Sequence, residues 1–284
     1  MNKVVLINYA NDKYRKTQKL NTWTGKHLAG FKNVIEYGPN DIDKEFYNKN
    51  KKIFDIQRGN GLWLWKPYII YKTLKELQNG DVVFYCDSGA CFFRSVKPIL
   101  KILEKQNIWV STTPFIERQF TKKLTFKLME CDNESYKNSN QIQGGFIAIK
   151  KSDDSMNFIK EWLDYCCNIE IISPEDNKEQ EEVGFYAHRE DQSVLSLLIK
   201  KYHLKVYSDP TQYGRLPEKY FREGCIMNYY LKEDYPICII LHRTANADFK
   251  NIFKQWLCAI LPRRIGLKFI DTHDNKKGLK DGKK

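Results

Sequence analysis

Short apolar runs alternate with amphipathic stretches along most of the chain. Residues 4–9 (VVLINY), 33–37 (NVIEY) and 82–86 (VVFYC) each have the length of a strand. The first run is almost continuously apolar, which is typical of a strand buried on both faces of a sheet. Further strands are expected over residues 108–112, 142–150, 204–207 and 237–241.

Helical signals separate these runs. Asp12 can cap a helix that ends at Gly30, and Pro67 suits the first turn of a helix that precedes the strand at 82–86. Further helices are expected over residues 96–105, after Ser152, from Glu190 onward and over 248–261. Strands that alternate with helices predict an α/β fold, in which a mainly parallel sheet carries helices on both faces.

The length of 284 residues suits one large α/β domain with a small appendage. We expect the domain over residues 1–248, and an amphipathic helix with a basic tail over 249–284. No run of about 18 apolar residues is present, so no transmembrane helix is expected. The N-terminal apolar run is too short for a signal peptide, and we therefore expect a cytoplasmic protein.

The net charge of +12 narrows the choice of partners. It favours nucleic acid, an anionic membrane surface or a phosphorylated substrate. No zinc-finger, homeodomain, RNP or KH signature is present, so nucleic acid is not expected. The segment 262–284 holds eight Lys and Arg against three Asp, and it follows an apolar helix face. That combination suits an anionic membrane, although a helix packed on the core before a solvated tail explains it equally well.

A carboxylate stands where the strand at 82–86 ends. Asp87 is followed by Ser88 and Gly89, and ligands of open α/β sheets bind outside the carboxyl ends of the strands. A strand-end Asp can instead cap a helix. Nearby, residues 58–68 combine two glycines, two Trp, Arg58 and Lys66, a composition that favours phosphate binding and stacking over a buried strand.

Three further segments are candidates for the site. Gly144 and Gly145 open the strand at 142–150, where they allow a ligand to approach the backbone or form a β-bulge. Glu190 and Asp191 begin a helix, where a carboxylate complements the helix dipole or acts as a base. His242 ends a strand and is either a structural histidine or a metal ligand.

The segment RGNGLWLWKPYIIYKTLKELQNGDVVFYCDSGA, residues 58–90, resembles the signature of bacterial GT-A glycosyltransferases from capsule and lipopolysaccharide gene clusters. Members of that family show a glycine-rich turn, a WxWKP segment and a strand that ends in Asp-x-Gly. The resemblance extends over roughly residues 3 to 250. It implies a GT-A, Rossmann-like fold and a nucleotide-sugar donor, usually linked to UDP or GDP.

The resemblance also implies roles for individual residues. Nucleotide contacts fall on Asn8, Tyr9 and Arg15, and the donor pocket on Arg58, Trp65, Lys66, Ser88, Gly89, Gly144 and Gly145. Asp87 matches the first Asp of the DxD motif that binds Mn²⁺ or Mg²⁺, but Gly89 replaces the second. His242 is a candidate for a further metal ligand, and Lys and Arg side chains are the alternative to a metal.

From these features we expect a glycosyltransferase that moves a sugar to a hydroxyl of a bacterial surface glycan or a lipid-linked glycan. Asp191 is the preferred base or cation-stabilising carboxylate, with Glu190 second. The sequence leaves inversion or retention of the anomeric centre open. Two alternatives remain, namely a catalytically silent nucleotide-sugar-binding protein and a basic nucleic-acid-binding protein.

Overall fold

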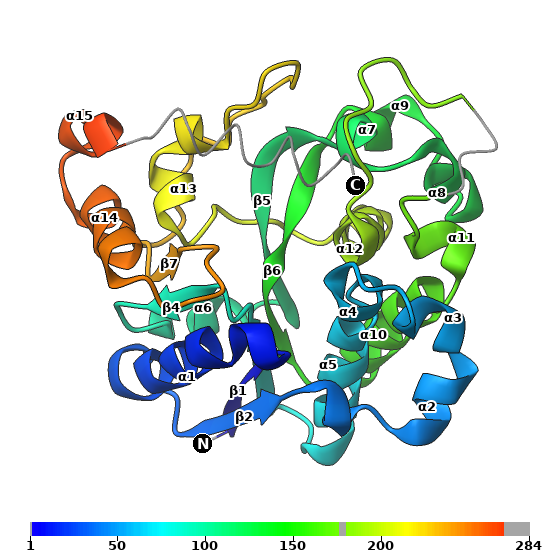
Figure 1. The fold of residues 1–284 in the computed structure, drawn as a ribbon, viewed down its shortest axis with the longest axis horizontal. Helices are drawn as coiled ribbons and strands as arrows, with labels where there is room; N and C mark the ends of the chain where they lie inside the picture. The colour runs from blue at the N-terminus through cyan, green and yellow to red at the C-terminus, as the bar shows by residue number, and fades with distance from the viewer. Residues whose placement is uncertain (1, 176–179, 270–284) are drawn as a thin grey trace.

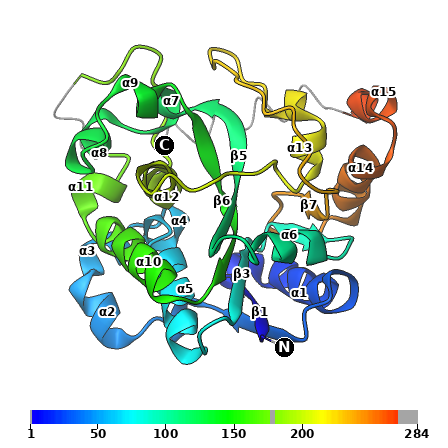
Figure 2. The same ribbon diagram turned by 180° about the vertical axis from the view of Figure 1, so that it is seen from behind.

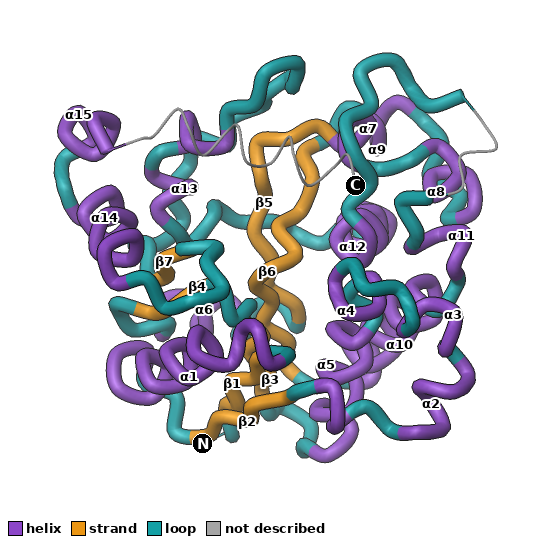
Figure 3. Tube along the Cα trace, viewed as in Figure 1, coloured by secondary structure: helices purple, strands orange, loops and turns teal. Residues whose placement is uncertain are grey.

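A five-stranded sheet runs through the centre of the molecule (Figures 1 and 3). The computed structural model describes residues 2–175 and 180–269. Across the sheet the strand order is β2 (Asn33–Tyr37), β1 (Val4–Tyr9), β3 (Val82–Cys86), β6 (Asn140–Lys150) and β5 (Ile108–Ile116). The predicted basic tail beyond residue 270 lies outside the described residues.

Four of these five strands point the same way. β1 pairs in parallel with both β2 and β3, whereas β6 is antiparallel to both β3 and β5. The reversal of β6 follows from its connection, since the chain leaves β5 through three short helices and re-enters the sheet with Asn140 opposite Ile116. The predicted α/β fold with a mainly parallel sheet is therefore confirmed, with β6 as the exception.

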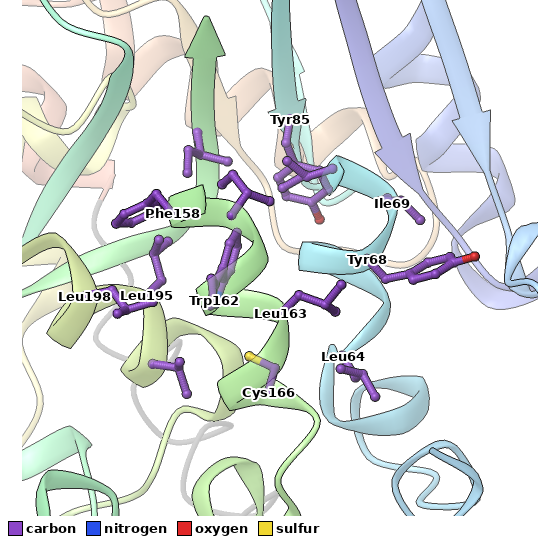
Figure 4. Close-up of a cluster of buried hydrophobic side chains, with 14 of the residues drawn as sticks. Leu64, Tyr68, Ile69, Tyr85, Phe158, Trp162, Leu163, Cys166, Leu195 and Leu198 are labelled. Carbon is purple, nitrogen blue, oxygen red and sulfur yellow. The ribbon is translucent and has the colours of Figure 1, made fainter. Parts of the chain in front are cut away.

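Helices cover both faces of the sheet, as the two opposite views show (Figures 1 and 2). Alternate residues of β1 reach the two sides, with Val5 and Ile7 in one core cluster and Leu6 in the other. The first face packs against α5 (Trp65–Glu76), α10 (Asp153–Cys166) and α12 (Glu190–Lys201). Figure 4 shows how Trp162 and Phe158 of α10 meet leucines of α12 in this core.

The opposite face is covered by α1 (Arg15–Thr24), the π-helical turn η2 (Gly25–Ala29) and α6 (Lys97–Ile102). The helix predicted to end at Gly30 is present, and Gly30 takes the left-handed conformation with φ of 94°. Beside these helices, β4 (Ala90–Phe92) and β7 (Ile239–Leu241) form a separate antiparallel pair. β4 begins directly after the turn that contains Asp87, so this small sheet adjoins the candidate site.

The remaining short helices connect these layers. They are η1 (Asp12–Tyr14), η3 (Pro39–Asp41), α2 (Lys44–Lys49), α3 (Lys51–Phe54), α4 (Gly59–Leu62), α7 (Glu117–Phe120), α8 (Lys123–Leu128), α9 (Glu134–Lys137), α11 (Ile169–Ile172), α13 (Gln212–Arg215), η4 (Pro217–Tyr220), α14 (Phe249–Ile260), α15 (Arg263–Gly266) and η5 (Leu267–Phe269). Asp248 caps α14, and Ala259 of that helix packs with Ile240 of β7. In the described part of the chain, no helix is long and apolar enough to cross a membrane.

Two local expectations differ from the structure. Residues 204–207, which were expected to form a strand, lie in a loop instead. Only a single bridge, between Tyr207 and Ser111, joins this loop to β5. Gly144 and Gly145 do not open a strand but lie inside β6. The register against β5 shifts next to them, which indicates a bulge.

Candidate functional site

A cleft of about 790 Å³ opens where β3 ends and α12 begins. Its walls include Arg58, Lys66, Asp87, Gly144, Gly145, Glu190 and Asp191, seven of the residues that the sequence put forward. They come from segments more than a hundred positions apart along the chain. The ends of β3 and α12, together with the bulge in β6, bring them into one cavity.

Asp87 faces this cleft from the end of β3. Its side chain is 36% exposed, and its backbone N–H donates to the carbonyl of Gly145 at 2.9 Å. The hydroxyl of Tyr85 donates to the Asp87 carboxylate, since residues two apart on a strand share one face. Burial, followed by the charge of Asp87, holds the pKa of Tyr85 well above its usual range, so the phenol keeps its proton.

Beneath Asp87 lies a buried ion pair. The Nζ of Lys66 is 2.9 Å from Oδ2 of Asp191 and 3.8 Å from Oδ1 of Asp87, and it donates to the carbonyl of Gly144 at 3.0 Å. Burial raises the pKa of Asp191 to about 6, although Lys66 opposes that rise. Burial also acts to lower the pKa of Lys66, but Asp191 and Asp87 outweigh it and raise that pKa. At neutral pH the pair is therefore predominantly ionised.

Glu190 lies beside this pair in an unusual backbone conformation. Its φ is 40°, a region that residues other than glycine seldom adopt and that is enriched at functional sites. The Nε of Arg58 lies 2.5 Å from Oε1 of Glu190, and the guanidinium sits 5.8 Å from the ring centre of Trp63. Burial raises the pKa of Glu190 to about 7 despite Arg58, which gives a carboxyl group that can exchange a proton near neutrality.

The glycines of the β6 bulge make room for these side chains. A Cβ on Gly145 would lie 3.0 Å from Oδ2 of Asp87, and one on Gly144 would lie 2.9 Å from Cβ of Gln192. The sequence left open whether these glycines form a β-bulge or allow another group to approach the backbone closely. In the structure they do both. The close approach is to protein side chains that line the cleft.

Trp65 and Tyr9 lie outside the cleft lining. Their rings stack at 3.8 Å with 12° between the planes, and the indole N–H of Trp65 donates to the carbonyl of Gly59 at 2.9 Å. Asn60 donates to the hydroxyl of Tyr9. The stack holds the glycine-rich turn against the end of β1, next to the first turn of α5 that carries Lys66.

Four other predicted residues are also placed away from the cleft. Asn8 is fully buried and donates to Asn21 at 2.9 Å, while Arg15 is exposed and donates to Gln18 at 3.2 Å. The hydroxyl of Ser88 donates to the carbonyl of Tyr9 at 2.7 Å. The carbonyl of Gly89 accepts the N–H groups of His242 and Arg243, which ties the Asp87 turn to the end of β7.

The candidate metal ligands do not form a metal site. Among the described residues, no group of three or more His, Cys, Asp or Glu could hold an ion. His242 is buried, its Nδ1 lies 3.0 Å from the hydroxyl of Thr244, and burial lowers its pKa to about 4. Asp87 already accepts from Tyr85 and lies near the ammonium of Lys66, which repels a cation. These residues therefore do not fit Mn²⁺ or Mg²⁺, the cofactors that the resemblance implies.

Several residues in or next to the cleft were not among the predicted site residues. Tyr85 was identifiable, because it stands two positions before Asp87 on the same strand face. Arg189 and Arg243 adjoin predicted positions, whereas Arg222 carries no sequence signal. The indole N–H of Trp162 donates to the backbone carbonyl of Asp191 at 3.0 Å, and this contact fixes the start of α12 from the core.

The sequence matches no protein-family profile and no curated protein. Solved structures that are similar in part include the galactosyltransferase LgtC in complex with donor and acceptor sugar analogs (13% identity, 92% of this chain, 98% of that chain, TM-score 0.45). Mouse xyloside xylosyltransferase 1 shares 8% identity over 84% of this chain and 96% of that chain, with a TM-score of 0.43. The glycosyltransferase GlyE from Streptococcus pneumoniae TIGR4 shares 11% identity over 94% of this chain and 62% of that chain, with a TM-score of 0.42.

Proposed function

We propose that this protein transfers a sugar from a nucleoside diphosphate sugar, linked to UDP or GDP, to a hydroxyl group of a glycan. The observation that carries the proposal is the group formed by Asp87, Lys66 and Asp191 in one cleft at the carboxyl end of β3. The resemblance of residues 58–90 to GT-A glycosyltransferases supports it, because Lys66 and Asp87 both belong to that segment.

In the proposed reaction, the bond between the anomeric carbon and the diphosphate oxygen breaks, and the diphosphate leaves with the bonding electrons. A bond forms from the acceptor oxygen to that carbon, and the acceptor proton passes to a carboxylate. Asp191 is the preferred group to accept that proton or to steady the positive charge that develops on the sugar, and Glu190 is the second candidate. Lys66 keeps Asp191 ionised in its buried position.

The proposed acceptor is a bacterial surface glycan, of the capsule or lipopolysaccharide type, or its lipid-linked precursor at the cytoplasmic side of a membrane. The support is the position of residues 185–187, which line the cleft from a loop between α11 and α12. Because loops vary more freely than the sheet, they are suited to select an acceptor.

A docking surface for such a membrane is proposed on α14. Phe249 and Phe253 are 73% and 58% exposed on this helix, and Ile265 of α15 is 43% exposed. Lys250, Arg263 and Arg264 lie beside them along the chain. Exposed apolar side chains next to basic groups suit the interface of an anionic bilayer.

The transferase proposal can be tested with a panel of UDP- and GDP-sugars and a set of glycan acceptors. We expect release of the nucleoside diphosphate with one donor, and a loss of at least about a hundredfold in Asp87→Ala and Asp191→Asn. Asp154→Asn is the matched control, because Asp154 is exposed on α10 outside the cleft. Donor binding without turnover would favour the catalytically silent alternative. Full activity in Asp87→Ala would remove Asp87 from the group of residues that carries the proposal.

A further inference from the structure

Three arginines from distant parts of the chain line the wall of the cleft nearest to β7. Arg189 directly precedes α12, Arg222 follows η4, and Arg243 follows β7. The transferase mechanism above assigns no role to any of them. Three cations facing one cavity repel one another, so their gathering needs an explanation.

Aromatic rings hold two of these guanidinium groups together. The Cζ of Arg189 lies 4.1 Å from the ring centre of Phe120 and 4.5 Å from that of Phe115. The Cζ of Arg222 lies 5.6 Å from the ring of the same Phe115. Arg189 also donates to Oε1 of Gln141 at 3.3 Å. Contact with the rings helps to hold both groups in place without using their N–H donors, which are left for a ligand.

Two of these arginines, Arg189 and Arg222, have no carboxylate of the described residues beside them, since none lies within 4.0 Å of either. Burial, followed by the charges of Arg222 and Arg243, lowers the pKa of Arg189 to about 9. Arg243 differs from the other two, because its charge acts on the buried carboxylate of Asp209, which also accepts from Tyr220 and from the N–H of Thr211.

The third arginine connects the cluster to the Asp87 turn. The backbone N–H of Arg243 donates to the carbonyl of Gly89 at 2.9 Å, and a Cβ on Gly89 would lie 3.6 Å from Cα of Arg243. Arg243 itself has a φ of 54°, a strained value for this residue type. The cluster therefore extends to the turn that carries Asp87, at the carboxyl end of β3.

We propose that Arg189, Arg222 and Arg243 form a diphosphate site that binds the pyrophosphate of the donor without a divalent cation. The inference rests on the proposed function for the identity of the ligand. Guanidinium groups bind phosphate oxygens with paired, charge-assisted hydrogen bonds, and three of them supply the charge that a metal otherwise provides. A site of this kind needs no metal ligands, and among the described residues no group of three or more His, Cys, Asp or Glu could hold an ion.

Calorimetric titration of the full chain with inorganic pyrophosphate, UDP and GDP tests this site. The titrations are carried out in EDTA and, separately, with MnCl₂. We expect pyrophosphate to bind in EDTA, with a Kd that rises at least about tenfold in Arg222→Gln and in Arg243→Gln. Arg94→Gln is the control, because Arg94 is exposed and lies outside the cleft. Circular dichroism verifies that each variant is folded.

The outcomes separate this inference from the transferase proposal. Binding in EDTA that weakens in the cleft variants but not in Arg94→Gln supports the diphosphate site, whether or not any sugar is transferred. Binding that requires Mn²⁺, or that is equal in all variants, would overturn it, as would the absence of pyrophosphate binding by the unmodified protein. Sugar transfer that requires Mn²⁺ and Asp87 while the arginine variants stay fully active would overturn the inference and leave the transferase proposal standing.

Discussion

The ammonium group of Lys66 lies 2.9 Å from a carboxylate oxygen of Asp191, and both side chains are about 95% buried. Lys66 belongs to the first turn of α5 and Asp191 to the first turn of α12. The pair thus joins two helices that pack on the same face of the sheet. Several consequences of this arrangement and of the surrounding site can be measured.

Replacing Lys66 with Met should destabilise the fold by about 3–5 kcal/mol, because Asp191 would remain buried without its partner. Urea unfolding at pH 7 measures this change. Lys51→Met is the matched control, since Lys51 forms an exposed ion pair with Asp55 and its loss should leave the free energy of unfolding nearly unchanged. The double variant Lys66→Met, Asp191→Leu should recover part of the loss, and a double variant as unstable as the single would contradict the assignment.

Glu190 should impose a pH dependence near neutrality. If Glu190 accepts the acceptor proton, the pH profile of kcat/KM should have an acidic limb, with activity falling below about pH 7. Glu190→Gln should abolish this limb. If Asp191 is the base, the limb should lie near pH 6 and persist in Glu190→Gln. A pH profile of both proteins decides between them.

The same raised pKa of Glu190 has an effect on stability. A carboxyl group whose pKa is higher in the folded than in the unfolded state favours the fold at low pH, and this contribution is lost as the pH rises from about 4.5 to about 7. Relative to Glu190→Gln, the unmodified protein should therefore lose stability across that window. Urea unfolding of both proteins at several pH values measures the difference, and parallel pH curves would count against the buried position of Glu190.

Gly145→Ala should impair activity more than stability. The added Cβ would lie 3.0 Å from Oδ2 of Asp87, so the carboxylate, which accepts from Tyr85 through Oδ1, would have to shift by a few tenths of an ångström. We expect kcat to fall at least about tenfold, with a small change in the melting temperature. Gly266→Ala meets a comparable contact, 3.1 Å from Cδ1 of Leu216, outside the cleft, and should remain active. Equal activities of the two variants would show that the position of Asp87 is unimportant.

The docking surface on α14 predicts selective binding to anionic vesicles. Sedimentation with phosphatidylglycerol vesicles should pellet the protein, and neutral phosphatidylcholine vesicles should not. Phe249→Ser with Phe253→Ser should reduce pelleting severalfold, since both side chains are exposed. Leu231→Ser is the control, because Leu231 is 77% exposed on a different loop. Unchanged pelleting in the double phenylalanine variant would exclude this surface.

The sequence predicted the layers of the fold more successfully than the composition of the site. Continuous apolar runs and helix signals such as Gly30 reflect local chemistry, and the structure has β1, β2, β3 and α1 where they indicated. The strand direction of β6 and the loop at residues 204–207 depend on tertiary connections, which periodicity does not record. Of the residues that line the cleft, Lys66 and Asp87 belong to a sequence motif and could be predicted. Arg222 belongs to no motif, and only the tertiary structure brings it to the cleft.

In the bulge of β6, two neighbouring backbone carbonyls accept hydrogen bonds from different groups of the site. The carbonyl of Gly144 accepts from Lys66, and that of Gly145 accepts from the N–H of Asp87. The spacing between the buried cation and the acid at the rim is consequently set by main-chain atoms of a central strand rather than by side-chain rotamers. Such a centre is preorganised, because backbone atoms of the sheet help to hold its charges in position.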